Sequence, residues 1–172
     1  MKNFKKLADE YRHRIYTFAF YSLGDHEDAE DATQDVLIRL WKHYEELKDT
    51  LLPAWIIRVT RNACIDRIRK RRTYARRVVG SPDGEYFEGT STDPGPETLM
   101  EKTELRARIQ SALAGLNEPY RSVVILREIQ DLKYEEIAQA VDLPLNTVKS
   151  YIHRGRKMLR EELREIVSHD AV

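Results

Sequence analysis

Apolar residues recur at helical spacing through the first half of the chain. They fall three or four residues apart in three successive segments, at these positions: Leu7, Tyr11, Ile15 and Phe18; Val36, Leu37, Leu40, Trp41 and Tyr44; Trp55, Ile56, Val59, Ala63 and Ile68. This spacing puts apolar side chains on one face of an α-helix. Gly24 separates the first two segments, and Pro53 suits the first turn of the third helix.

The second half shows the same periodicity with clearer start signals. Residues 98–101 can form a capping box before a helix, and Asn117 can cap the next helix. The apolar positions of these two helices are Leu105, Ile109, Leu113, Val123, Val124 and Ile129. No segment alternates apolar and polar residues over a sustained run. The pattern therefore predicts an all-α fold without a sheet.

From Tyr134 onward the spacing becomes more specific. Ile137, Ala138 and Val141 form the apolar face of a short helix, residues 142–144 interrupt it, and Asn146 can cap a second helix. A turn of three to four residues between two helices is typical of a helix-turn-helix, which places the start of its second helix in the major groove of DNA.

Helix-breaking residues gather in one segment, residues 79–97. It contains Gly80, Pro82, Gly84, Gly89, Pro94, Gly95 and Pro96, with Ser and Thr between them and no basic residue. Such composition predicts a flexible acidic linker. We therefore expect two small helical domains, residues 1–78 and 98–172, each with its own core. An ordered surface loop is the alternative, although structureless loops of this length are uncommon inside compact domains.

The net charge of zero conceals unlike segments. The 172 residues include 29 Lys and Arg and 29 Asp and Glu. Residues 1–78 hold 17 basic and 12 acidic side chains, residues 79–97 hold 0 and 5, and residues 98–172 hold 12 and 12. The balance of the whole chain therefore does not argue against nucleic-acid binding.

Two clusters of opposite charge mark the N-terminal domain. Residues 25–35 hold six carboxylates and no base, whereas residues 54–78 hold nine bases and one acid. The carboxylates are explained equally well as favourable charges at the start of a helix or as a functional surface. The segment is not a calcium-binding loop, because it lacks the Gly and the terminal Glu of that pattern. The basic run includes Tyr74. Basic side chains next to an aromatic ring are suited to binding unpaired nucleic acid, whose exposed bases can stack on the ring.

The second helix of the predicted motif is also basic. Residues 145–160 hold five basic side chains and no acidic one. Amide, hydroxyl and cationic groups near the helix start can bond to base edges or phosphates; these are Asn146, Thr147, Lys149, Ser150, His153 and Arg154. A solvated basic helix without a ligand remains the alternative.

The single cysteine, Cys64, excludes an internal disulfide and a cysteine-rich zinc site. With His13, His26 and His43 it gives no metal-ligand spacing, so we predict a buried Cys64 and neither metal nor cofactor. No apolar run reaches the roughly 18 residues of a membrane span, and the N-terminus does not resemble a signal peptide. A soluble cytoplasmic protein is expected.

Three blocks of this sequence resemble the signature blocks of extracytoplasmic-function sigma factors, group 4 of the sigma-70 family. The blocks are residues 28–36, residues 55–67, and residues 134–138 followed by 146–156, and they occur in the family's order across nearly the whole chain. The resemblance implies a sigma-2-like helical bundle, a linker and a sigma-4-like helix-turn-helix domain. It implies a transcription-initiation factor, not an enzyme, that binds core RNA polymerase and promoter DNA, with a partner anti-sigma factor.

The resemblance also assigns roles to residues of this chain. Docking on the clamp helices of polymerase is implied for Asp31, Gln34, Asp35, Leu37, Ile38 and Trp41. Binding and opening of the minus-ten element is implied for Arg58, Arg61, Asn62, Asp66, Arg67, Arg69, Lys70, Arg71, Arg72 and Tyr74. Reading of the minus-thirty-five element, with the domain on the polymerase flap, is implied for Asn146, Thr147, Lys149, Ser150, Tyr151, His153, Arg154 and Arg156.

The sequence departs from the family pattern at a few positions. Lys133 replaces a usual Ser or Thr helix cap, Asp142 replaces a usual Gly, and Tyr151 replaces a common Arg. A promoter sequence cannot therefore be carried over from another member. Two other functions stay open: a stand-alone helix-turn-helix regulator that binds duplex DNA as a dimer, and a metal-dependent nuclease using the carboxylates of residues 25–35.

Overall fold

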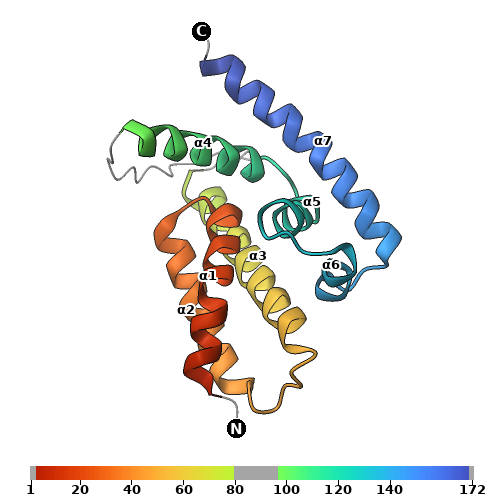
Figure 1. The fold of residues 1–172 in the computed structure, drawn as a ribbon. Coiled ribbons are helices and arrows are strands. Elements are labelled where there is room, and N and C mark those ends of the chain that lie inside the picture. The colour runs from red at the N-terminus through yellow and green to blue at the C-terminus, as the bar shows by residue number, and fades with distance from the viewer. Residues whose placement is uncertain (1–2, 80–96, 171–172) are drawn as a thin grey trace.

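The computed structural model describes residues 3–79 and 97–170, and within them every regular element is a helix. The elements are α1 (Phe4–Leu23), α2 (His26–His43), α3 (Leu52–Val79), α4 (Glu97–Ala114), α5 (Tyr120–Val124), the π-helical turn η1 (Ile125–Ile129), α6 (Tyr134–Val141) and α7 (Leu145–Asp170) (Figure 1). This confirms the predicted all-α fold with two helical domains. The predicted flexible linker lies outside the described residues, apart from its two ends in α3 and α4.

The N-terminal domain is a bundle of α1, α2 and α3 (Figure 1). Asn3 begins α1 by accepting a hydrogen bond from the Lys5 N–H at 3.0 Å, and Gly24 ends it with φ 76°. Asp25 then caps α2 through the Asp28 N–H at 3.2 Å. At least this carboxylate of the acidic cluster therefore serves as a helix cap.

The C-terminal domain contains the predicted helix-turn-helix in α6 and α7. Asp142 ends α6 in the left-handed conformation, with φ 57°, and its N–H bonds to the Ala138 carbonyl. Lys133 precedes α6 and has no side-chain oxygen to accept from the first turn, but the Glu136 carboxylate accepts the Lys133 N–H at 2.7 Å, which is the Glu half of a capping box.

Two of the predicted caps are wrong and one cannot be assessed. Helix α7 begins at Leu145, so Asn146 lies inside its first turn. Pro119 precedes α5 and no side chain caps that helix, so the Asn117 side chain does not cap it. The side chains of residues 98–101, where a capping box is predicted, lie outside the described residues. Sequence places a cap only to within a residue or two, because a helix can gain a turn when packing favours it.

A buried arginine holds the end of α4. Arg121 is 4% exposed and donates to the carbonyls of Leu113 at 3.1 Å, Ala114 at 3.0 Å and Leu116 at 2.6 Å. The Leu113 and Ala114 carbonyls are at the end of α4, where backbone acceptors lack a donor four residues on, and the Leu116 carbonyl lies in the connection that follows. Burial lowers the pKa of Arg121, while Glu118 opposes the change. The guanidinium therefore fixes the connection between α4 and α5.

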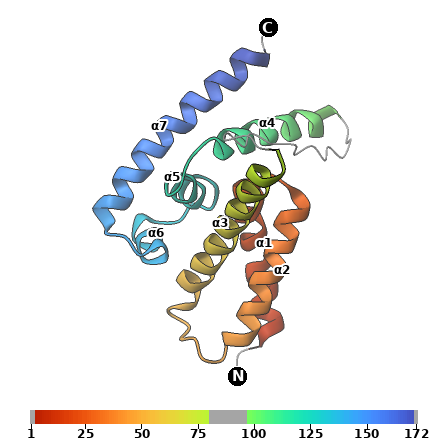
Figure 2. The same cartoon turned by 180° about the vertical axis from the view of Figure 1, so that it is seen from behind.

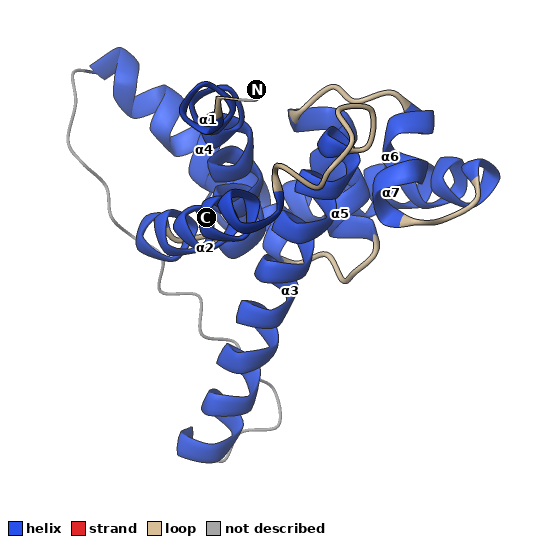
Figure 3. Ribbon diagram, turned by 90° about the horizontal axis from the view of Figure 1, so that it is seen from below, coloured by secondary structure: helices blue, strands red, loops and turns tan. Residues whose placement is uncertain are grey.

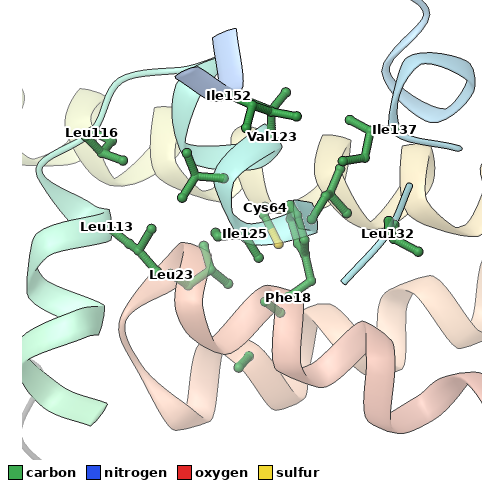
Figure 4. Packing of buried hydrophobic residues seen from close by; sticks show 14 of the residues in the cluster. Phe18, Leu23, Cys64, Leu113, Leu116, Val123, Ile125, Leu132, Ile137 and Ile152 are labelled. Carbon is green, nitrogen blue, oxygen red and sulfur yellow. The ribbon is translucent and has the colours of Figure 1, made fainter. Parts of the chain in front are cut away.

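The two domains share one apolar cluster, which differs from the two separate cores that the sequence predicts. The cluster combines Phe18, Leu23 and Cys64 with Leu113, Val123, Ile125, Leu132, Ile137 and Ile152 (Figure 4). A second cluster, built around Ile15, Val36, Leu40 and Ile56, lies within the N-terminal bundle. Helix α3 serves both, because Ile56 and Ala63 face its own bundle whereas Ile57, Cys64 and Ile68 face the shared cluster.

Gly155 lies where α7 passes close to α5. A Cβ at this position would meet the Val124 Cγ2 at 2.5 Å. We expect Gly155→Ala to lower the free energy of unfolding by about 1–3 kcal/mol, because overpacking outweighs the roughly 1 kcal/mol by which Ala favours a helix interior over Gly. Urea denaturation measures the change.

The control for this prediction is the double variant Gly155→Ala with Val124→Ala. Removing the two Val124 methyl groups makes room for the new Cβ, so the two substitutions should be less destabilising together than the sum of their separate effects. An increase in stability for Gly155→Ala alone would contradict the close approach of the two helices.

Candidate nucleic-acid interfaces and docking surface

Helix α2 carries an exposed face of mixed character. Asp31, Gln34, Asp35, Ile38 and Trp41 lie on it, and we call these five residues the α2 face. Ile38 is 53% exposed and Trp41 is 60% exposed. Large apolar side chains held in solvent on a charged helix are typical of a protein-binding surface.

Leu37 does not belong to this face. It is 8% exposed and packs with Ile15, Val36 and Leu40 in the N-terminal cluster. Leu37 is buried because of the helical periodicity of α2, which places it on the inward side of the helix with Thr33, Val36 and Leu40. Leu37 can support the shape of the α2 face but offers almost no surface of its own.

The last turns of α3 form a basic projection. Helix α3 extends beyond the rest of its bundle (Figure 3), and its end carries exposed Arg69, Lys70, Arg72 and Tyr74. Tyr74 is 69% exposed. An exposed ring among cations offers a stacking face for an unpaired base and charges for a phosphate backbone.

Two of the basic residues predicted to bind the minus-ten element form ion pairs with the acidic cluster of α2. Arg67 contacts the Asp35 carboxylate, and Arg71 contacts Asp28 while donating to the Leu23 carbonyl at 2.9 Å. Burial lowers the pKa of Arg71, and Asp25 opposes this change. The two opposite charge clusters therefore partly neutralise each other inside the domain. Arg69, Lys70 and Arg72, together with Arg76 and Arg77, stay exposed around Tyr74.

The predicted site residues in the first half of α3 differ in their surroundings: some are only exposed to solvent, and others contact the C-terminal domain. Asn62 and Asp66 are exposed on successive turns. Arg58 is exposed as well, but it also bonds to carbonyls of α6, at 3.2 Å from Gln139 and 3.4 Å from Ala140. Arg61 is partly buried and lies 3.8 Å from the Glu118 carboxylate. The structure thus brings these two arginines against the C-terminal domain.

Helix α7 runs along the outer side of the C-terminal domain (Figure 2), and most of its predicted residues are exposed. Asn146, Lys149, Ser150, His153 and Arg154 are exposed, and we call them the α7 face. Val148 and Ile152, by contrast, are buried and hold the helix on the domain. An exposed helix face of this width can enter a major groove without moving the core.

The other three predicted residues of α7 have contacts within the domain. Tyr151 packs edge-on against Tyr120 with ring centroids 5.4 Å apart. Arg156 pairs with Glu128, and Thr147 is half-buried. These residues position the α7 face more than they extend it.

The sequence did not single out Gln110 and Gln130, which join the two domains. The Gln110 amide donates to the Phe20 carbonyl at 3.0 Å, and the Gln130 amide donates to the Arg14 carbonyl at 2.7 Å. A contact between the domains could have been expected from a second apolar stripe on α3, formed by Ile57, Cys64 and Ile68. Such a stripe indicates that another surface covers this side of the helix.

The described residues contain no group of three potential metal ligands. Cys64 is fully buried as predicted, and burial raises the pKa of its thiol to about 12. A thiol with that pKa stays protonated and does not act as a nucleophile or ligand near neutral pH. Among the helices described, none has the length and apolar character needed to cross a bilayer.

These elements define a two-domain helical protein with a helix-turn-helix. Comparison with known proteins makes the assignment specific. Residues 7–74 match the family model described as Sigma-70 region 2, and residues 106–159 match that described as Sigma-70, region 4. The chain belongs to the extracytoplasmic-function sigma factors, a branch of the sigma-70 family of transcription-initiation factors.

Individual relatives agree with this membership. The chain is 32% identical over 168 residues to the ECF RNA polymerase sigma factor SigW of Bacillus subtilis, covering 95% of this chain and 90% of that protein. It is 33% identical over 171 residues to SigE of Mycolicibacterium smegmatis, covering 99% of this chain but only 65% of that relative's length. The alternative of a stand-alone regulator is not favoured by these matches.

A solved structure supports the same assignment. The sigma factor RpoE of Bartonella quintana, crystallised in complex with the anti-sigma factor NepR, superposes with a TM-score of 0.75 at 26% identity. The match covers 95% of this chain and 98% of that one.

Proposed function

We propose that this chain binds core RNA polymerase through the α2 face and promoter DNA through α3 and α7, without catalysing a reaction itself. The observation that carries the proposal is the pair of apolar side chains held exposed on α2, Ile38 and Trp41. By analogy with the family, the α2 face contacts the clamp helices of polymerase, and the C-terminal domain rests on the flap. The cytoplasm, where polymerase and promoters are found, is the corresponding location.

The division of labour follows the division into domains, which we place at residues 1–78, 79–97 and 98–172. Strand opening needs cations and a site for an unstacked base, and the end of α3 offers both in Arg69, Lys70, Arg72 and Tyr74. Asn62 and Asp66 lie two to three turns earlier on the same helix and provide polar groups for the minus-ten element. Duplex readout needs an exposed helix of polar residues, which the α7 face offers at the minus-thirty-five element.

An anti-sigma factor is proposed as a further partner. The structural relative RpoE is bound to the anti-sigma factor NepR, and its chain matches almost the full length of this one. A partner of this kind would have to cover polymerase-binding or DNA-binding surfaces to inhibit transcription. The α2 face, where Ile38 and Trp41 are exposed, is one candidate for such a contact.

Run-off transcription with purified core polymerase tests the proposed function. We expect a promoter-specific transcript and co-purification of the chain with core polymerase. Failure of both would reject the proposal. Footprinting of a palindromic site by the chain alone would instead favour a dimeric regulator.

Removing a cation from the α7 face is expected to weaken reading of the upstream element. Lys149→Ala and Arg154→Ala should each reduce promoter affinity of the holoenzyme by about 1–3 kcal/mol, because each loses a contact to a base edge or phosphate. Core affinity should stay unchanged, since neither residue lies on the α2 face. Promoter binding is measured by filter retention or fluorescence anisotropy.

The control for these variants is Lys6→Ala. Lys6 is exposed on α1 and its removal changes the net charge by the same amount. A similar loss of promoter affinity in Lys6→Ala would indicate a general charge effect, and a loss of core affinity in Lys149→Ala or Arg154→Ala would contradict the assignment of roles.

A further inference from the structure

Glu128 belongs to none of the surfaces assigned above, yet it contacts α7. It lies in η1, and its carboxylate pairs with the Arg156 guanidinium. The side chains of Glu128 and Arg156 are 38% and 41% exposed, so the pair lies at the surface of the C-terminal domain. The hydrogen bond to Glu128 raises the pKa of Arg156, and burial opposes this change. Arg156 is therefore engaged within the domain, although the family resemblance assigns it to the minus-thirty-five element.

The residue before Glu128 holds η1 on the first helix of the motif. Arg127 donates to the Leu132 carbonyl at 2.8 Å, and its guanidinium carbon lies 5.1 Å from the centroid of the Tyr134 ring at the start of α6. Adjacent side chains of η1 thus contact both helices of the helix-turn-helix, α6 through Arg127 and α7 through Glu128. The π-helical turn therefore relates the two helices to each other.

The contacts between α5 and α7 leave the direction of α7 less well determined. Tyr120 meets Tyr151 edge-on, and Gly155 lies at the close crossing of α7 with α5. Apolar contacts are non-directional, and a glycine has no side chain that could interlock at the crossing. The pair of Arg156 with Glu128 is directional, because a hydrogen bond weakens steeply when donor and acceptor are misaligned.

A small change in the direction of α7 is amplified along the helix. Lys149 lies six residues before the crossing at Gly155, and Asn146 lies nine residues before it. At 1.5 Å per residue these separations are about 9 Å and 14 Å. A turn of about 10° at the crossing would therefore move the two residues by about 1.6 Å and 2.4 Å. Both displacements exceed the range of about 0.5 Å over which N–H···O distances of hydrogen bonds vary.

We infer that Glu128 is a positioning residue for promoter recognition: it holds Arg156, and through Arg156 it fixes the direction in which α7 enters the major groove. The inference rests on the proposed function of the α7 face. Its expected sign is the reverse of a simple charge effect, since a carboxylate on a DNA-binding domain repels phosphates. If Arg156 itself contacted a phosphate, removing Glu128 would release the guanidinium and tighten binding.

The test compares Glu128→Ala with Glu128→Gln in the holoenzyme. The probes are a promoter duplex that supports run-off transcription and the same duplex with a scrambled minus-thirty-five element. Glu128→Ala should bind the promoter about two- to fivefold more weakly, because exposed ion pairs contribute modestly, and should bind the scrambled duplex as well as the wild type does. Glu128→Gln keeps an oxygen acceptor for Arg156 without the charge, so it should retain most of the wild-type affinity.

Two further variants separate positioning from charge and from a direct contact. Glu135→Ala removes an exposed carboxylate of α6 and should not weaken promoter binding. Arg156→Ala should add little to the loss in the Glu128→Ala background, because both substitutions break the same pair. Circular dichroism checks that each variant keeps the helix content of the wild type.

Three results would overturn the inference. They are unchanged or tighter promoter binding by Glu128→Ala, equal weakening of Glu128→Ala on both duplexes, and a large additional loss from Arg156→Ala in the Glu128→Ala background. Failure of the proposed function has a different signature. In that case Lys149→Ala and Arg154→Ala would also leave promoter affinity unchanged, whereas failure of the inference alone leaves their losses intact.

Discussion

Trp41→Ala is expected to weaken binding to core RNA polymerase by about thirtyfold or more. A large aromatic side chain that is 60% exposed in the free chain can bury most of that surface on a partner. Truncation of such an anchor at the centre of an interface costs about 2–4 kcal/mol, and 1.4 kcal/mol corresponds to a tenfold change in affinity. Affinity is measured by titrating labelled chain with core polymerase.

The fold should be unaffected by this substitution. Trp41 lies outside both buried clusters, so the urea midpoint of Trp41→Ala should match that of the wild type within error. Leu51→Ala is the matched control, because Leu51 is also a large apolar residue, 48% exposed, but lies outside the α2 face. Equal core affinity of Trp41→Ala and Leu51→Ala would remove the α2 face from the proposed docking surface.

Arg121→Ala is expected to lower the free energy of unfolding by about 3 kcal/mol or more. The substitution removes three hydrogen bonds from a charged donor and leaves the carbonyls of Leu113, Ala114 and Leu116 without this partner. Hydrogen bonds to charged groups contribute about 1.5–3 kcal/mol each, and an unsatisfied buried acceptor adds its own penalty. Urea denaturation followed by circular dichroism measures the loss.

Two further variants make this prediction specific. Arg121→Lys keeps the charge but lacks the planar fork that reaches several carbonyls, so it should fall between the wild type and Arg121→Ala. Arg160→Ala removes an exposed arginine of α7 and should change stability by no more than about 0.5 kcal/mol. If Arg121→Ala and Arg160→Ala are equally stable, the buried guanidinium does not hold the end of α4.

Local signals in the sequence predicted much of the fold correctly. The apolar spacing of Leu7 to Phe18 and of Val36 to Tyr44 located α1 and α2, and the interruption at Asp142 located the turn of the helix-turn-helix. These features depend on a few neighbouring residues, so the chain encodes them regardless of distant contacts. Caps were less reliable, as Asn117 and Asn146 show, because a helix boundary shifts by a residue when packing favours another turn.

The sequence predicted which residues belong to the candidate sites and their chemical character, but it did not predict which other side chains they contact. The basic character of α3 was evident, but nothing in the sequence indicated that Arg67 and Arg71 contact Asp35 and Asp28 on α2. Leu37 was predicted to contact polymerase with the other residues of α2, but its side chain is buried in the core. Pairing of side chains from different helices depends on how those helices cross, which periodicity does not specify.

The sequence by itself determined the helices, the helix-turn-helix and the charge of each segment, because each follows from residues close together in the chain. Only the tertiary structure decided that Ile57, Cys64 and Ile68 on α3 pack against the C-terminal domain, and that Arg58 and Arg61 are engaged there. A helical repeat shows which side chains share a face, but the surface that covers this face comes from a domain on the far side of the predicted linker. That long-range choice is made by burial of apolar area and by satisfaction of polar groups in the folded chain.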